Sequence, residues 1–219
     1  MRLTTKTIRT ARRHLRAADP VMASMIKTVG PFTLRFDRNR FGMLVRSIIS
    51  QQISTSAARS IRKRLQELVG PDGLTAANLA RFTTDELRPG GLSSQKASYI
   101  ADLASKVNDG TLNLRQIGRL SDELVVETLT QVRGIGQWTA QMFLIFSLGR
   151  PDVFPHDDLG VRTAIRDRYG LDDLPDKNTS RAIASPWQPY ASVASWYCWR
   201  SLDLARNTKR VAKGIKQSN

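Results

Sequence analysis

The sequence predicts an all-α fold with short connections. Apolar residues recur at intervals of three and four over most of the chain, for example in residues 41–49 and 57–68, and this is the spacing of one helix face. Clusters of Gly, Pro, Ser and Asp separate these segments and mark turns. Residues 32–36 are the one stretch with a strand-like pattern.

In the first half of the chain, the two periodic segments flank a break at residues 51–54, and a Gly-Pro-Asp-Gly turn at residues 70–73 ends the second. Thr84 is expected to cap a short turn. Ser93 is expected to cap a helix that continues to Val107.

In the second half, Ser121 opens a helix. A Gly-Ile-Gly turn then leads into a helix over residues 137–148. A loop with two adjacent aspartates leads into a helix near residues 160–169, and a last helix follows Pro189 and runs towards Ala205.

The composition bounds the class of protein. The chain has 219 residues, 41% of them hydrophobic, which is ample for a packed core. Its single cysteine, Cys198, excludes an intrachain disulfide and any iron–sulfur cluster that needs four cysteines of this chain. With only His14 and His156 beside it, a structural zinc site is not expected. No apolar run reaches membrane-spanning length, and no secretory signal is recognised.

The charge is strongly basic and unevenly placed. The net charge is +15, of which residues 1–16 carry +6 and residues 200–219 carry +5. Such a balance favours nucleic acid as the partner, although solubility or anionic lipid would also explain it. The two ends are expected to be basic tails, at about residues 1–16 and 206–219, that either contact a polyanion or are solvated.

The turn Gly134-Ile135-Gly136 suits an anion. Its glycines allow a close backbone approach, and the helix after it presents unpaired N–H groups and the positive end of a dipole. Ile135 can pack the turn into the core. The alternative is an ordinary helix–helix turn, since G-x-G alone is a weak signal.

With Trp138, Thr139 and the later Asp158 included, the chain resembles the helix-hairpin-helix DNA glycosylases. The likeness is to their alkylation-repair branch, the 3-methyladenine DNA glycosylase II of the short bacterial and yeast type. The matching residues are 47–54, 91–93, 96–97, 132–140, 152–160 and 187–190. The resemblance implies a single glycosylase unit over residues 1–219, with two helical subdomains and an active-site cleft between the two lobes.

The resemblance assigns the catalytic role to Asp158. Loss of a base leaves positive charge on the sugar, which a carboxylate stabilises, or the carboxylate activates water. The neighbouring Asp157 would cap the following helix or orient the loop. In the alternative interpretation, both aspartates are only helix caps.

Trp138 indicates which chemistry is absent. Bifunctional relatives place a lysine at this position, whose amine attacks the sugar and permits strand cleavage. Tryptophan cannot do so, and this implies a monofunctional enzyme that uses water. Lys96, the nearest alternative amine, is expected to be solvated or to face a phosphate.

Aromatic residues are expected to form a base pocket. Trp138, Trp187 and Tyr190 would line it, because a cationic alkylated base over an aromatic face gains roughly 0.5–2 kcal/mol. The alternative is that they belong to the core, which is the interpretation preferred for a second group: Trp196, Tyr197 and Trp199.

The resemblance also implies contacts with DNA. Gly134, Ile135, Gly136 and Thr139 would bind the backbone. Gln52 would be the wedge that fills the gap left by a flipped base, although a plain polar turn at Gln51-Gln52 is the alternative. The resemblance further implies a sodium or potassium ion held by main-chain carbonyls of the hairpin, here those of Thr130, Val132 and Ile135.

The implied function is hydrolysis of the N-glycosidic bond of alkylated purines in double-stranded DNA, above all 3-methyladenine and also 7-methylguanine, in base excision repair. No cofactor is expected beyond the optional hairpin ion. We expect a monomer that acts without a membrane, in the cytoplasm at a bacterial nucleoid or in a eukaryotic nucleus. Two alternatives stay open: a glycosylase for oxidised or mismatched bases, and a non-catalytic hairpin DNA-binding protein.

Overall fold

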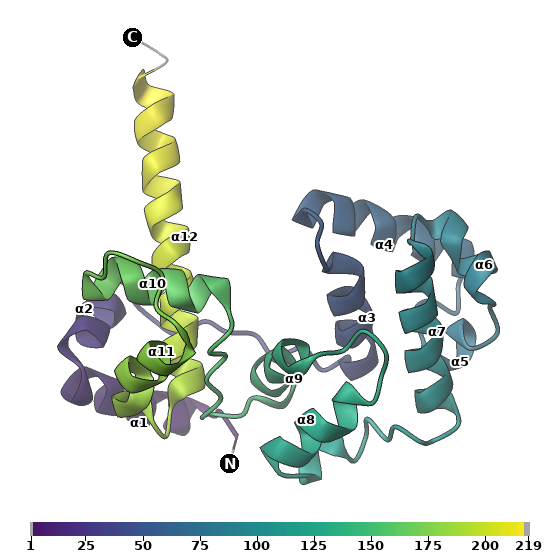
Figure 1. The fold of residues 1–219 in the computed structure, drawn as a ribbon, viewed down its shortest axis with the longest axis horizontal. Helices are drawn as coiled ribbons and strands as arrows, with labels where there is room; N and C mark the ends of the chain where they lie inside the picture. Colours follow the sequence, from purple (N-terminus) through teal and green to yellow (C-terminus); the bar gives the residue numbers. More distant parts are fainter. Residues whose placement is uncertain (1, 217–219) are drawn as a thin grey trace. The chain divides into compact units, whose positions relative to one another are not determined.

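The computed structural model describes residues 2–216, with side chains for residues 2–208, and divides the chain into two compact units (Figure 1). The terminal unit combines Met1–Arg35 with Gly149–Asn219, and the central unit is Phe36–Leu148. Within the described residues, the regular structure is helical and no strand is present. The expected all-α class is confirmed.

The terminal unit brings the two ends of the chain together. Its helices are α1 (Thr5–Ala18), α2 (Pro20–Val29), α10 (Leu159–Tyr169), α11 (Lys177–Ala184) and α12 (Ala191–Lys216). Helix α12 packs on α2 and α10, and α1 packs on α2 (Figure 1). Fully buried side chains from these helices form the core, among them Leu15, Met22, Ile26, Val161, Ile165, Val193 and Tyr197.

Asp19 joins the first two helices of this unit. Its Oδ1 accepts hydrogen bonds from the backbone N–H groups of Val21 and Met22, at 2.9 and 3.0 Å, and so caps α2. Its Oδ2 accepts from the Tyr169 hydroxyl, and from Trp187 Nε1 at 2.9 Å. Burial, reinforced by Asp19, raises the pKa of Tyr169, so this hydroxyl stays a donor.

The central unit is built from shorter helices. They are α3 (Arg40–Ser50), α4 (Thr55–Val69), α5 (Ala76–Leu79), α6 (Thr84–Leu87), α7 (Ser94–Asn108), α8 (Asp122–Thr130) and α9 (Gln137–Phe143), which continues into a π-helical segment, η3 (Leu144–Leu148). Ser and Thr side chains cap several of them, and the caps are Ser54, Thr75, Thr83, Ser93 and Ser121.

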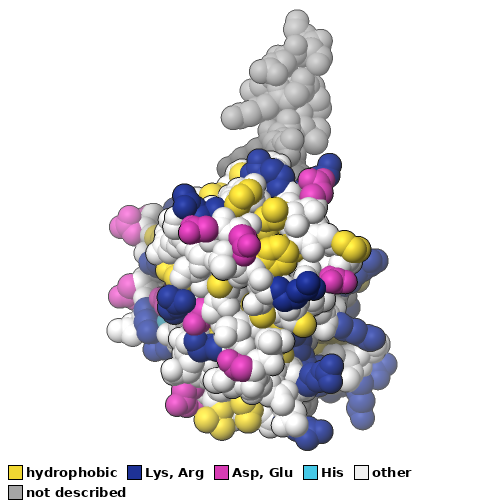
Figure 2. Space-filling model, turned by 90° about the vertical axis from the view of Figure 1, so that its right-hand side faces the viewer, with side chains coloured by type: hydrophobic (Ala, Val, Ile, Leu, Met, Phe, Trp, Pro, Cys, Tyr) yellow, Lys and Arg dark blue, Asp and Glu magenta, His cyan; other side chains and the backbone are white. Residues whose placement is uncertain are grey.

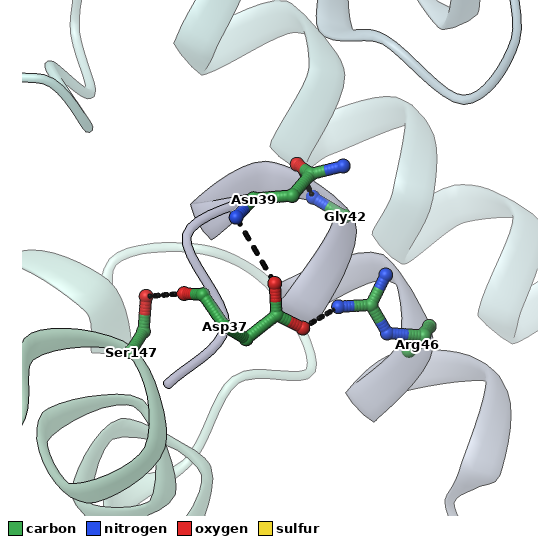
Figure 3. Close-up of polar contacts among 5 residues, drawn as sticks. All are labelled: Asp37, Asn39, Gly42, Arg46 and Ser147. Carbon is green, nitrogen blue, oxygen red and sulfur yellow. Dashed lines mark hydrogen bonds and ion pairs between the residues drawn. The ribbon is translucent and has the colours of Figure 1, made fainter. Parts of the chain in front are cut away.

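A polar cluster fastens the start of this unit to its end (Figure 3). The Ser147 hydroxyl donates to the carbonyl of Asp37 at 2.8 Å, and the Asp37 carboxylate pairs with Arg46 of α3. Asn39 caps α3 through the N–H of Gly42, at 2.8 Å. A Cβ on Gly42 would lie only 2.6–2.9 Å from the Asn39 side chain, so this cap requires glycine. The cluster thereby anchors α3 beside η3.

Most expected helices are confirmed, and four details differ. Most of the expected N-terminal basic tail, about residues 1–16, lies in α1, which is capped by Thr4 and buried through Ala11 and Leu15. Residues 32–36 form no strand, the cap of the short helix is Thr83 rather than Thr84, and the helix expected over residues 137–148 changes to π geometry at Leu144.

At the other end, residues 206–216 continue α12. Residues 217–219 of the expected C-terminal tail, and the side chains of residues 209–216, lie outside the described part.

Candidate active site

Asp158 is a largely buried carboxylate that receives two directed hydrogen bonds. Its residue is 8% exposed and precedes α10, where Oδ1 accepts from the backbone N–H of Val161 at 2.8 Å. The same Oδ1 accepts from Trp199 Nε1, also at 2.8 Å. The dipole of α10 stabilises negative charge at this helix end. The two donors fix the orientation of the carboxyl group.

The two adjacent aspartates have different surroundings. Asp157 was expected to cap the following helix or to orient the loop, and the cap is Asp158. Asp157 is exposed instead, with Oδ2 3.0 Å from Nδ1 of the buried His156. Asp158 is therefore both the helix cap and the candidate catalytic residue. A cap role alone does not explain why Trp199 also donates a hydrogen bond to it.

Trp199 is the residue that the sequence interpretation missed. It was assigned to the core, but its half-buried indole reaches from α12 to Asp158. Gly160 makes this approach possible, because a Cβ there would lie 2.9 Å from Trp199 Cδ1 and 3.0 Å from Asp158 Oδ1. The glycine two positions after Asp158 was the only local signal, since Trp199 is 41 residues away. The core assignment is confirmed for Trp196 and Tyr197, which pack edge to face.

Trp187 and Tyr190 lie in the same unit as Asp158, with different exposure. Trp187 is fully buried, donates to Asp19 and packs edge to face on Phe154. This placement is at odds with the expected pocket role of Trp187, since its indole has no exposed face on which a base could stack. Tyr190 is half-buried, with its ring against that of His14.

The hairpin lies in the central unit and joins α8 to α9. Val132 N–H donates to Leu129 and Ile135 N–H to Val132, which closes a tight turn. Gly134 has φ +79°, and a Cβ there would lie 2.0 Å from the Tyr99 ring. Glycine is therefore required both for its conformation and for space. Ile135 is buried, as expected for a residue that packs the turn into the core.

The first turn of α9 carries two more expected residues. Gly136 is the N-cap, so the N–H groups of the first turn have no acceptor within the helix. Trp138 in this turn is 44% exposed. Thr139, the other expected residue, is buried.

The loop between α3 and α4 carries the two glutamines. Gln51 Nε2 donates to the carbonyl of Gly134 at 2.8 Å. Gln52 is exposed and has φ +57°, the one positive φ of a non-glycine residue in the described chain. Lys96 was expected to be solvated or to face a phosphate, and it is half-buried instead of fully solvated. Its Nζ donates to the carbonyls of Ile49 and Gln51, both at 2.7 Å, and partial burial lowers its pKa.

The structure thus groups the expected residues by unit. Asp158, Tyr190 and the newly found Trp199 belong to the terminal unit, and the hairpin, Trp138 and Gln52 belong to the central unit. Among the described residues, no cluster of three or more His, Cys, Asp or Glu side chains could ligate a metal ion. In the same part of the chain, none of the helices has the length and apolar composition that crossing a bilayer would need.

Comparison with known proteins gives sequence relatives. Residues 45–189 match the family described as HhH-GPD superfamily base excision DNA repair protein. A putative DNA-3-methyladenine glycosylase of Bacillus subtilis is 35% identical over 176 residues, which cover 78% of this chain and 61% of that protein. DNA-3-methyladenine glycosylase 1 of Schizosaccharomyces pombe is 32% identical over 211 residues, which cover 90% of this chain and 89% of that protein.

A solved structure is also similar. The 3-methyladenine DNA glycosylase of Schizosaccharomyces pombe in complex with abasic DNA matches with a TM-score of 0.79 and 31% identity, over 90% of this chain and 98% of that chain. The family match includes the hairpin, Asp158 and Trp187. This chain therefore belongs to the HhH-GPD superfamily of base excision DNA repair proteins.

Proposed function

We propose that this protein is a monofunctional DNA glycosylase that hydrolyses the N-glycosidic bond of alkylated purines in double-stranded DNA. Its substrates are 3-methyladenine and also 7-methylguanine, and its product is an abasic site for base excision repair. The names of its relatives support this activity. The observation that carries it is the buried carboxylate of Asp158, oriented by the N-terminus of α10 and by Trp199.

Asp158 is the catalytic residue in this proposal. As the base departs, positive charge develops on the sugar, and a fixed carboxylate stabilises that charge or takes a proton from the attacking water. A preorganised carboxylate needs little reorganisation when the charge appears, and both hydrogen bonds to Oδ1 supply that preorganisation. Trp199 and Gly160 act through Asp158 as positioning residues.

Trp138 occupies the hairpin position at which bifunctional relatives have a lysine, so this chain has no amine there. The amine of Lys96, considered as the alternative, already donates to two carbonyls. No Schiff base with the sugar is therefore expected, and the DNA strand stays intact.

Trp138 of the central unit, which is 44% exposed, is proposed to stack on the flipped base. A cationic base stacks well on an aromatic face, and its charge already weakens the glycosidic bond. Trp187 is fully buried and supports the terminal unit instead, through its hydrogen bond to Asp19.

The central unit is proposed to hold the DNA. Backbone N–H groups of Gly134, Gly136 and Thr139 would bind a phosphate. Gln52, exposed at a tight turn, would be the wedge. Lys and Arg side chains are scattered over the face seen in Figure 2, with Asp and Glu among them. The net charge of +15 favours the approach of DNA.

A monovalent cation fits the hairpin chemically. Thr130 ends α8 and Val132 lies in the turn after it, where carbonyls lack helical partners. The Val132 carbonyl accepts one bond, from Ile135 N–H, which leaves a lone pair. With the carbonyl of Ile135, these oxygens would hold a sodium or potassium ion, which would add positive charge facing a phosphate. We further propose a monomer without an iron–sulfur cluster, acting wherever the genomic DNA lies.

The test is an Asp158→Asn variant with Asp157→Asn as its matched control. The Asp158 variant should bind duplex DNA with an abasic site but release almost no base from a methylated duplex, because the amide cannot stabilise the cation. The Asp157 variant should keep a near-normal rate. Near-normal release by Asp158→Asn would contradict the assignment. If the unaltered protein releases no base from a panel of alkylated, oxidised and mismatched duplexes, the chain is a non-catalytic DNA binder.

A further inference from the structure

One side of α7 contacts both loops that are proposed to meet DNA. Lys96, Tyr99 and Asp102 follow one another at intervals of three, which places them on neighbouring positions of the helix surface. Lys96 contacts the loop between α3 and α4, and Tyr99 packs on Gly134 of the hairpin. Asp102 Oδ2 accepts from the backbone N–H of Arg133 at 2.9 Å. The two loops, which contain Gln51 and Gly134, 83 residues apart in the sequence, therefore both contact α7.

Lys96 closes the end of α3. The last carbonyls of a helix lack N–H partners, and a cation near them is favourable. The last turn of α3 has no basic residue of its own. Lys96 of α7 supplies the charge instead, through two hydrogen bonds of 2.7 Å to the carbonyls of Ile49 and Gln51.

Gln51 then connects the two loops. Its carbonyl is held by Lys96, and its Nε2 donates to the carbonyl of Gly134 at 2.8 Å. Gln52 follows directly, with its backbone in the left-handed region at φ +57°. A non-glycine residue in that conformation needs support from its surroundings. Lys96 thus holds the carbonyl of the peptide bond that precedes Gln52, and the Gln51 side chain links the same turn to the hairpin.

We infer that Lys96 is a positioning residue for the wedge. Through Gln51 it holds the backbone of Gln52 at a fixed position relative to the hairpin turn. The hairpin can then bind the DNA backbone while the Gln52 side chain inserts into the base stack. The inference rests on the proposed function. It differs from a phosphate contact by Lys96, because a phosphate contact adds to affinity for any DNA, whereas a misplaced wedge lowers the rate of base release.

The test compares Lys96→Met with Lys96→Arg and with a matched surface control, Lys63→Met. The Met side chain keeps the apolar stem without the donors, and Arg keeps the charge and the donors. Lys63 lies on α4 of the same unit, is exposed and pairs only loosely with Glu67, at 3.7 Å. Single-turnover release of 3-methyladenine measures the rate, and thermal unfolding checks the fold. The salt dependence of affinity is measured with a duplex containing a tetrahydrofuran abasic analogue.

We expect Lys96→Met to release base at least about tenfold more slowly than Lys63→Met, because small displacements of positioned groups cost that much or more. Lys96→Arg should restore most of the rate. The slope of log affinity against log salt should be the same for Lys96→Met and Lys63→Met. A rate within about twofold of the control, or a slope reduced by about 0.9 relative to Lys63→Met as for one lost phosphate contact, would overturn the inference.

Gln51→Ala supplies a second route if Lys96→Met does not fold. It should also slow base release severalfold, since it cuts the bond to Gly134. If Lys96→Met folds, the double variant should be no slower than Lys96→Met alone. Fully additive losses would contradict a shared role. Absence of base release by the unaltered protein would refute the proposed function, while the salt slopes with the abasic analogue would still decide whether Lys96 meets phosphate.

Discussion

At the scale of single residues, the proposed chemistry rests on the pair of Asp158 and Trp199. Its two halves come from the loop before α10 and from α12, and no local pattern joins them. The motif around Asp158 made this carboxylate predictable from the sequence. The indole donor was not, because a tryptophan on an apolar helix looks the same whether its ring faces the core or a carboxylate.

Trp199→Phe should lower the rate of base release by about tenfold or more, because it removes one of the two donors that orient Asp158. Its free energy of unfolding should fall by only about 0.5–1.5 kcal/mol from the lost hydrogen bond, plus a packing loss at a half-buried site. Trp196→Phe is the matched control on the same helix: it should lose stability but keep its rate. Equal rates for the two variants would argue against a positioning role.

Cys198 should be chemically silent in the folded protein. It is completely buried, and burial, reinforced by the charges of Asp19 and Asp158, raises the pKa of its thiol. A thiol-specific reagent at pH 8 should label it only after unfolding in urea. Rapid labelling of the native protein would show that this part of the terminal unit opens readily.

At the scale of elements, capping patterns made much of the fold predictable. Ser93 and Ser121 begin helices where their sequence context indicates, since a serine before a periodic apolar segment has a physical reason to be a cap. Helix α1 was missed because its apolar stripe is narrow and its many arginines resemble a tail. The burial of Trp187 was missed because its partner, Asp19, lies 168 residues away.

Asp102 should tie hairpin stability to pH. Burial raises its pKa, but the bonds from Lys106 and Arg133 outweigh that effect and hold the pKa below its ordinary value. The stabilisation is therefore present above about pH 4, the value of the unfolded carboxyl, and is lost as pH falls through the lower folded pKa. Asp102→Asn should unfold about 0.5–1.5 kcal/mol more easily than the parent at pH 7. In urea titrations that difference should vanish in acid, and a constant difference would contradict the ion-pair origin.

At the scale of the whole molecule, the proposed work is divided between the two units. The carboxylate belongs to the terminal unit, and the hairpin and wedge belong to the central unit. Changes at Asp158 should therefore alter the rate with little effect on affinity for abasic DNA, and changes in the hairpin turn should alter affinity first. Both sets of variants are compared on one duplex sequence, by the single-turnover rate of base release and by the affinity for the abasic form.

The protein is proposed to hydrolyse the N-glycosidic bond without cleaving the DNA strand. The most direct measurement incubates the protein with an end-labelled duplex that carries one 3-methyladenine, and analyses both the released base and the strand on a denaturing gel. Free 3-methyladenine should appear while the strand stays whole until alkali is added, and borohydride should trap no covalent complex. A strand cut without alkali, a trapped complex or no released base would contradict it.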